Sequence, residues 1–222
     1  MLVFLGAVLM VVLAEMGDKT QLLAMAMAAR FSAKSVLMGV FLATVLNHAL
    51  AVALGNYLGT SLNLGVIQII TSGSFILFGL WTIRGDSLQG EEQRKSLWGP
   101  VLTVSIAFFF AEMGDKTQFA TIALAAKYNA PLAVLMGTTV GMLIADALGI
   151  YVGVVAGKKM PEQVVKWISA MLFIAFGYIG LYTSVPGDYL TAPYIAGLVG
   201  ATALAVYIIA RKGAPERSQE KP

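Results

Sequence analysis

Cysteine is absent from the 222-residue chain, and histidine occurs only once. The first absence excludes disulfides and thiolate metal ligands, and the second argues against a soft zinc or copper site. Any metal chemistry in this chain must therefore depend on oxygen ligands. Charged residues are also scarce: they make up 12% of the chain, whereas a soluble domain carries about 25%.

Hydrophobic residues, by contrast, make up 58% of the chain. They form seven apolar runs, each close to the roughly 20 residues that a helix needs to cross a bilayer. The sequence therefore predicts an all-α, polytopic membrane protein with seven transmembrane helices. These are expected at Leu2–Ala29, Val36–Leu58, Val66–Ile83, Val101–Ala126, Leu132–Ala156, Val165–Tyr182 and Tyr194–Ala210.

The basic residues are distributed unequally between the two ends of these runs. Of the 15 Lys and Arg residues, twelve fall on one side, Lys127 alone falls on the other, and Lys19 and Lys116 lie within runs. The positive-inside rule then places the N-terminus outside and the C-terminus in the cytoplasm. Because the chain is compact and shows no targeting extension, we expect it in a plasma membrane. The net charge of +3 follows from this topology, so we expect no nucleic acid partner.

The stretch of eight residues from Ala14 to Gln21, the octet, occurs twice, because residues Ala111 to Gln118 repeat it letter for letter. Similar positions continue beyond it, and they divide the chain into two three-helix repeats, 1–84 and 98–184. An odd number of helices per repeat inverts the second copy in the membrane, an arrangement typical of secondary transporters. A cytoplasmic linker (85–97), an extra transmembrane helix (185–211) and a disordered cytoplasmic tail (212–222) complete the predicted organisation.

Each copy of the octet places two acids in the middle of an apolar run, where an unpaired charge costs several kcal/mol. Glu15 and Asp18 are three residues apart, as are Glu112 and Asp115, so each pair is expected on one face of a continuous helix. If inverted symmetry brings the two helices together, four carboxylates converge near the bilayer centre. Such a cluster requires either a cation or protons for neutrality.

The remaining polar residues of the octets have both chemical and structural interpretations. Lys19 and Lys116 follow each Glu by one helical turn and can pair with it, and we favour charge balance over direct participation in transport. The neutral oxygens of Thr20, Thr117, Gln21 and Gln118 could be ligands, with bonding to the helix backbone or bridging between helices as the alternative. Carboxylate, amide and hydroxyl oxygens together suit hard divalent cations such as Ca²⁺ and Mn²⁺.

Three further polar residues lie inside apolar runs. His48 and Asp146 are related by the repeat offset, and Asn47 precedes His48. An ionisable pair at equivalent depth is a candidate proton relay or outer support for the site. For His48 a purely structural hydrogen-bonded role stays an equal alternative.

The pattern E-x-G-D-[KR]-[TS], present at Glu15–Thr20 and Glu112–Thr117, resembles the Gdt family of the calcium/cation antiporter superfamily. That family includes Golgi, bacterial and chloroplast manganese transporters, and the resemblance covers about residues 1–184. It implies exchange of Mn²⁺ or Ca²⁺ for protons by alternating access, with manganese export, with the motif acids as ligands, and with no enzymatic activity or prosthetic group. Two alternatives stay open: an exporter of small organic cations or amino acids, and a membrane scaffold whose buried charges are only salt-bridged.

Overall fold

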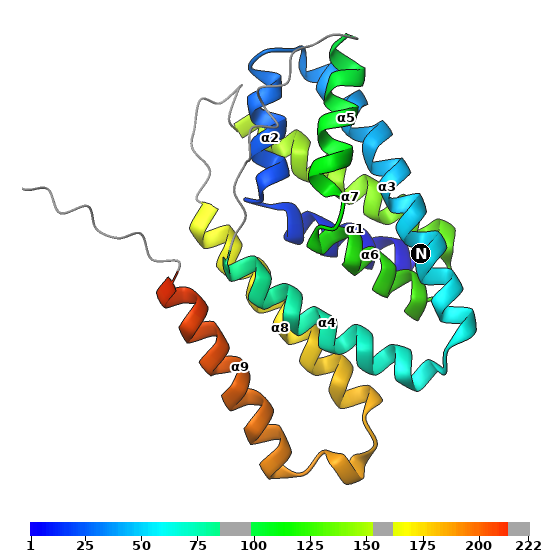
Figure 1. Cartoon of the computed structure of the whole chain (residues 1–222), viewed down its shortest axis with the longest axis vertical. Coiled ribbons are helices and arrows are strands. Elements are labelled where there is room, and N and C mark those ends of the chain that lie inside the picture. Colours follow the sequence, from blue (N-terminus) through cyan, green and yellow to red (C-terminus); the bar gives the residue numbers. More distant parts are fainter. Residues whose placement is uncertain (85–98, 153–161, 213–222) are drawn as a thin grey trace, which may run out of the picture.

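The computed structural model describes residues 1–84, 99–152 and 162–212, and the regular structure in these ranges is entirely helical (Figure 1). The helices that contain or follow the two octets are α1 (Leu2–Glu15), α2 (Lys19–Ala28), α5 (Pro100–Glu112) and α6 (Lys116–Lys127). The others are α3 (Ala33–Ser61), α4 (Leu64–Arg84), α7 (Pro131–Ile150), α8 (Glu162–Ser184) and α9 (Ala192–Lys212), with a short 3-10 helix at Gly187–Tyr189.

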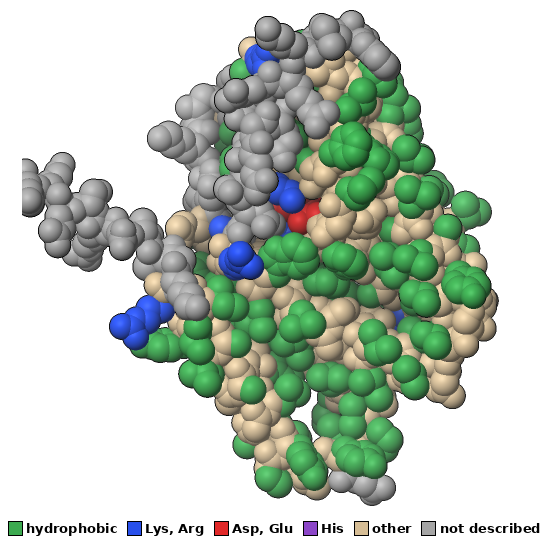
Figure 2. All heavy atoms as spheres, in the orientation of Figure 1, with side chains coloured by type: hydrophobic (Ala, Val, Ile, Leu, Met, Phe, Trp, Pro, Cys, Tyr) green, Lys and Arg blue, Asp and Glu red, His purple; other side chains and the backbone are tan. Residues whose placement is uncertain are grey.

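Five helical segments are long and apolar enough to cross a membrane: α3, α4, α7, α9 and the part of α8 from Lys166 to Ser184. Helices α1 and α5 are apolar but shorter. Hydrophobic side chains are spread over the part of the visible face that the structure describes (Figure 2), as expected for a surface that faces lipid. The chain is therefore a multi-pass membrane protein. The predicted linker and residues 213–222 of the predicted tail lie outside the described residues.

The two runs that contain the octets are not continuous helices, so the prediction of one helix for each run is wrong. Each helix ends at the motif Glu, and a new one begins at the motif Lys. Between α1 and α2, Met16 has φ −60° and ψ 117°, and Gly17 has φ 76°, values close to those of the central residues of a type II turn. The Asp18 N–H donates to the Glu15 carbonyl over 3.0 Å and closes the turn.

The second octet makes the same turn. Met113 has φ −67° and ψ 118°, Gly114 has φ 77°, and the Asp115 N–H donates to the Glu112 carbonyl over 3.1 Å. Glycine is needed at its second central position because a side chain is disfavoured at positive φ. The sequence Glu-Met-Gly-Asp therefore interrupts both helices at equivalent points.

Glycines related by the sequence repeat make equivalent close contacts between helices. A methyl group on Gly39 of α3 would lie 2.8 Å from the Val101 carbonyl oxygen of α5, and one on Gly137 of α7 would lie 2.6 Å from that of Phe4 in α1. Likewise Gly79 of α4 faces the backbone of α8, and Gly177 of α8 faces that of α4. These positions allow the backbones to approach closely, and they fix α3 against α5 and α7 against α1 in the same manner.

The central helices enclose the core, and α9 lies at the edge of the bundle (Figure 1). Core residues come from both octet-bearing segments and from α3, α4 and α7, with Val11, Leu23, Val104, Phe108 and Met142 among the largest buried side chains. Helix α9 packs on α4, and a hydrogen bond of 2.8 Å joins Thr202 in α9 to Tyr178 in α8. Its apolar surface is otherwise largely exposed.

Candidate cation site

The helix breaks bring two helix C-termini and two helix N-termini to the motif residues. Glu15 and Glu112 are the last residues of α1 and α5, while Asp18 and Asp115 occupy the N-cap positions of α2 and α6 without a side-chain capping hydrogen bond. Helix C-termini carry partial negative charge and attract cations, whereas helix N-termini favour carboxylates. The Glu side chains therefore stand where a cation is favoured, and the Asp side chains stand where a negative charge is favoured.

A glutamine closes each turn from inside the following helix. The Gln21 Oε1 atom accepts a hydrogen bond from the Gly17 N–H over 2.7 Å, and Gln118 Oε1 accepts one from Gly114 over 2.8 Å. Gln21 also donates to the Ala145 carbonyl of α7 over 2.6 Å. The amide oxygens that were expected as candidate ligands are thus engaged in holding the turns.

Three carboxylates from the two octets meet at one buried position. One oxygen each from Glu15, Glu112 and Asp115 lie within 4.8 Å of one another, and all three side chains are at most 1% exposed. Both oxygens of Glu112 lack a hydrogen-bond partner among the described residues. A buried carboxylate without a partner is costly, and an additional positive charge at this position would offset that cost.

Both motif threonines donate to the same carboxylate. Thr20 Oγ1 donates to Glu15 Oε2 over 2.7 Å, and Thr117 Oγ1, from the other octet, donates to Glu15 Oε1. All three side chains are fully buried. Glu15 is thereby held in place, while its counterpart Glu112 is not.

The two lysines pair across the octets and not within them. Lys116 Nζ lies 2.7 Å from Asp18 Oδ1, and Lys19 Nζ lies 3.6 Å from Asp115 Oδ1. The expected pairing of each lysine with the Glu one turn earlier in its own helix is wrong, because the helix breaks between them. The first pair is almost fully buried, whereas the Lys19 side chain is 20% exposed.

Helix α7 contributes a further buried acid beside the cluster. Asp146 is fully buried, its oxygens have no hydrogen-bond partner among the described residues, and its charge interacts with those of Glu15, Asp18 and Glu112. His48 and Asn47 are buried on α3, where Asn47 donates to the Phe109 carbonyl over 3.0 Å. No described hydrogen bond or ion pair joins His48 to the motif acids.

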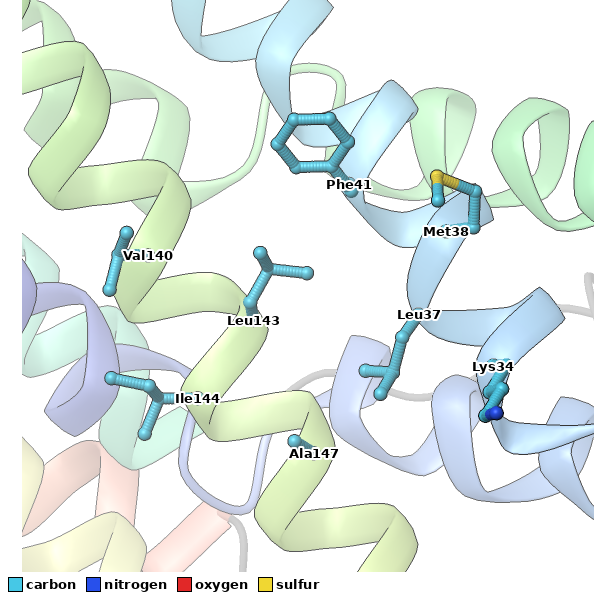
Figure 3. Close-up of a pocket in the computed structure, with 8 residues that line it drawn as sticks. All are labelled: Lys34, Leu37, Met38, Phe41, Val140, Leu143, Ile144 and Ala147. Atoms are coloured by element: carbon cyan, nitrogen blue, oxygen red, sulfur yellow. The ribbon is translucent and has the colours of Figure 1, made fainter.

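The pocket between α3 and α7 is unlike this cluster. It has a volume of about 570 Å³, seven apolar side chains line it, and Lys34 lies at one edge (Figure 3). Its lining lacks the oxygen ligands that a hard cation needs. Figure 2 instead shows a small group of acidic and basic atoms near the middle of an apolar face. Apart from Asp146, the buried Asp, Glu and Lys side chains of the described residues all belong to the octets.

Sequence reasoning found the motif side chains but missed the backbone groups that support them. The carbonyls of Ala145 and Phe109 accept hydrogen bonds from Gln21 and Asn47. Every residue has a backbone carbonyl, so the residue type does not show which carbonyl accepts a hydrogen bond. The repeat offset relates His48 to Asp146, the residues that follow Asn47 and Ala145, and it predicted only that His48 and Asp146 lie at equivalent depth.

Comparison with known proteins supports the resemblance to the Gdt family that the repeated motif indicates. The model of a protein family described as "Divalent cation/proton antiporter GDT1" matches residues 3–90 and 100–188. A Vibrio cholerae protein named "Putative manganese exporter" is 41% identical over 166 residues, which are 74% of this chain and 82% of that protein. No solved structure matches significantly.

More distant relatives carry the family name. A GDT1-like protein of Synechocystis sp. is 30% identical over 207 residues, which are 82% of this chain and 98% of that protein. A chloroplastic GDT1-like protein of Oryza sativa subsp. japonica is 26% identical over 212 residues, 80% of this chain and 61% of that protein. Because the family model matches both octet-bearing halves of a chain that crosses the membrane repeatedly, the protein belongs to the GDT1 family.

Proposed function

We propose that this protein is a secondary antiporter that exports Mn²⁺, or Ca²⁺, in exchange for protons, in a plasma membrane. Glu15, Glu112 and Asp115 are the proposed cation ligands, with Asp18 held beside them by Lys116 and with Asp146 as a nearby proton acceptor. The Thr20 and Thr117 hydroxyls position Glu15. Lys19 and Lys116 balance the charge of the two aspartates, and Asn47 and His48 support the site from α3.

One observation carries this proposal: Glu112 is buried, has no hydrogen-bond partner among the described residues, and has an oxygen within 4.8 Å of oxygens of two other carboxylates. Carboxylates this close repel one another unless a cation or a proton neutralises them. Either occupant satisfies the same position. Competition between metal and proton for one position is the requirement for exchange.

The same geometry supports this proposal over the two alternatives left open by the sequence. The three ligand atoms lie within 4.8 Å of one another, close enough for one small divalent ion to contact all three, which favours a bare ion over a bulkier organic cation or amino acid. A scaffold held by salt bridges accounts for the two lysine–aspartate pairs but gives no reason to bury Glu112 without a partner. The name of the Vibrio relative favours manganese as the cargo.

Alternating access is proposed to follow from two inverted repeats, α1 to α4 and α5 to α8, with the N-terminus outside and the C-terminus in the cytoplasm. The equivalent glycine contacts and the matching turns support this arrangement. The site lies where the two octets meet, so movement of one repeat against the other can expose it to either side in turn. Helix α9 stands outside this exchange.

Metal binding can be tested on the purified protein. We expect Mn²⁺ to raise the thermal unfolding temperature by mass action, with Ca²⁺ second and Mg²⁺ and Zn²⁺ less effective. The effect should weaken at lower pH because protons compete for the same oxygens, and it should be lost in Glu112→Gln. Thr121→Val, which alters a buried hydroxyl bonded to the α6 backbone, is the matched control. Equal stabilisation of Glu112→Gln and the unaltered protein by Mn²⁺ would exclude this ligand set.

A further inference from the structure

The two threonines at the site are equivalent in sequence, but their hydrogen bonds are not arranged symmetrically. Thr20 follows Glu15 by five residues and donates to it, which is a contact within one octet. Thr117 follows Glu112 by five residues but donates to Glu15 in the other octet. A symmetric site would divide the two hydroxyls between the two glutamates. Here one glutamate receives both and the other receives neither.

The reverse arrangement is available to the same side chains. The turns that join each Glu to its Thr have nearly identical backbone angles: φ is 76° at Gly17 and 77° at Gly114. Thr117 can therefore reach Glu112 as Thr20 reaches Glu15, and Thr20 can cross to Glu112 as Thr117 crosses to Glu15. The two arrangements contain the same number of hydrogen bonds. Their energies differ only through the surroundings.

The two turns also differ in how far they are exposed to solvent. Gly17 is buried and Met16 is half-buried, while Gly114 is exposed and Met113 is 50% exposed. The first turn is additionally tied to α7 by the bond from Gln21 to the Ala145 carbonyl. The turn beside the Glu that the threonines hold is thus buried. The turn beside the Glu that lacks a partner is exposed, although Glu112 itself is buried.

We propose that Thr20 and Thr117 form a threonine pair that transfers both of its hydrogen bonds from Glu15 to Glu112 when the site changes its access. In the arrangement seen here, Glu112 is the carboxylate that receives the cation or proton from the side of the second octet. After the transfer, Glu112 is held and Glu15 is released toward the side of the first octet. This inference rests on the proposed function, and it makes the two hydroxyls positioning residues for the exchange.

The lack of cysteine in the chain allows a direct test. Met16→Cys and Met113→Cys, made separately, place one thiol beside each turn, and the rate of labelling by a hydrophilic maleimide in detergent reports the exposure of each. Met113→Cys should react faster than Met16→Cys. Glu15→Gln weakens the acceptor of the present arrangement, so it should raise labelling at position 16 and lower it at 113. Glu112→Gln should do the opposite, with shifts of about tenfold for one charge-assisted hydrogen bond.

The mirrored pair of variants separates transfer from simple loss of charge, because each removes one buried carboxylate. Shifts in the same direction, or no shift, would overturn the proposed transfer. Glu15→Asp and Glu112→Asp, which keep the charge but withdraw the acceptor oxygens, should give the same opposite shifts, and they decide the question if the Gln variants do not fold. Thr121→Val in either cysteine background should leave labelling unchanged. Labelling needs no metal, so failure of Mn²⁺ transport would refute the proposed function without altering this result.

Discussion

The buried pair between Lys116 and Asp18 offers the sharpest test of how the site is held together. Its atoms are 2.7 Å apart, and the two side chains are 2% and 4% exposed. Lys116→Met preserves most of the side-chain volume but leaves the Asp18 carboxylate buried without its partner. Breaking a buried pair from one side costs about 3–5 kcal/mol. In a chain of this size that corresponds to a loss of roughly 6–20 °C in unfolding temperature.

The second lysine–aspartate pair provides an internal control for the Lys116→Met change. Lys19 makes the equivalent pair with Asp115, but over 3.6 Å and with the lysine side chain 20% exposed. Solvent screens this pair more effectively, so Lys19→Met should cost less, on the order of 1 kcal/mol. Thermal unfolding of both variants in one detergent, without metal, gives the ranking. The double variant Lys116→Met with Asp18→Asn removes both charges and should recover at least half of the loss.

Two results would refute this reasoning. Lys19→Met could destabilise the protein as much as Lys116→Met, which would mean that burial does not control the strength of these pairs. Alternatively, the double variant could be no more stable than the single one. In that case Lys116 would act through the carboxylate cluster as a whole and not through Asp18.

Two smaller changes test the turns. Gly114→Ala should cost about 1–2 kcal/mol in unfolding free energy, because an alanine at φ 77° is strained although no neighbouring atom obstructs its methyl group; an unchanged unfolding temperature would argue against the type II turn. Gln21→Leu should destabilise the protein more than Gln118→Leu in the same assay, because Gln21 is buried and bonds both its own turn and the Ala145 carbonyl. Equal losses would contradict the tie between α2 and α7.

The sequence was sufficient to predict that acids of the two octets lie together, because acids inside apolar runs have few structural explanations and the octet repeats without change. It was not sufficient to give the local fold. The spacing of Glu15 and Asp18 suggested one helical face only under the assumption of a continuous helix. The Met-Gly pair between the acids is also the central pair of a type II turn, and that signal was available but competed with a long apolar run. Hydrophobic length alone cannot distinguish one interrupted span from one unbroken helix.

The pairing of the lysines depended on this break. Once α1 ends at Glu15 and α2 begins at Lys19, the two residues are no longer one turn apart on one helix, and each lysine pairs with an aspartate of the other octet. The sequence also could not predict that Glu15 accepts hydrogen bonds from both threonines while Glu112 accepts neither. Identical octets give identical expectations, so any difference between them arises from the conformation that the whole protein adopts.

The most direct measurement of the central claim is Mn²⁺ flux into or out of proteoliposomes across an imposed pH gradient. The account predicts Mn²⁺ movement coupled to proton flow in the opposite direction, lost in Glu15→Gln and in Glu112→Gln and retained in Thr121→Val. Mn²⁺ flux that proceeds without a pH change, or that persists when both glutamates are replaced, would contradict exchange at the site where the two octets meet.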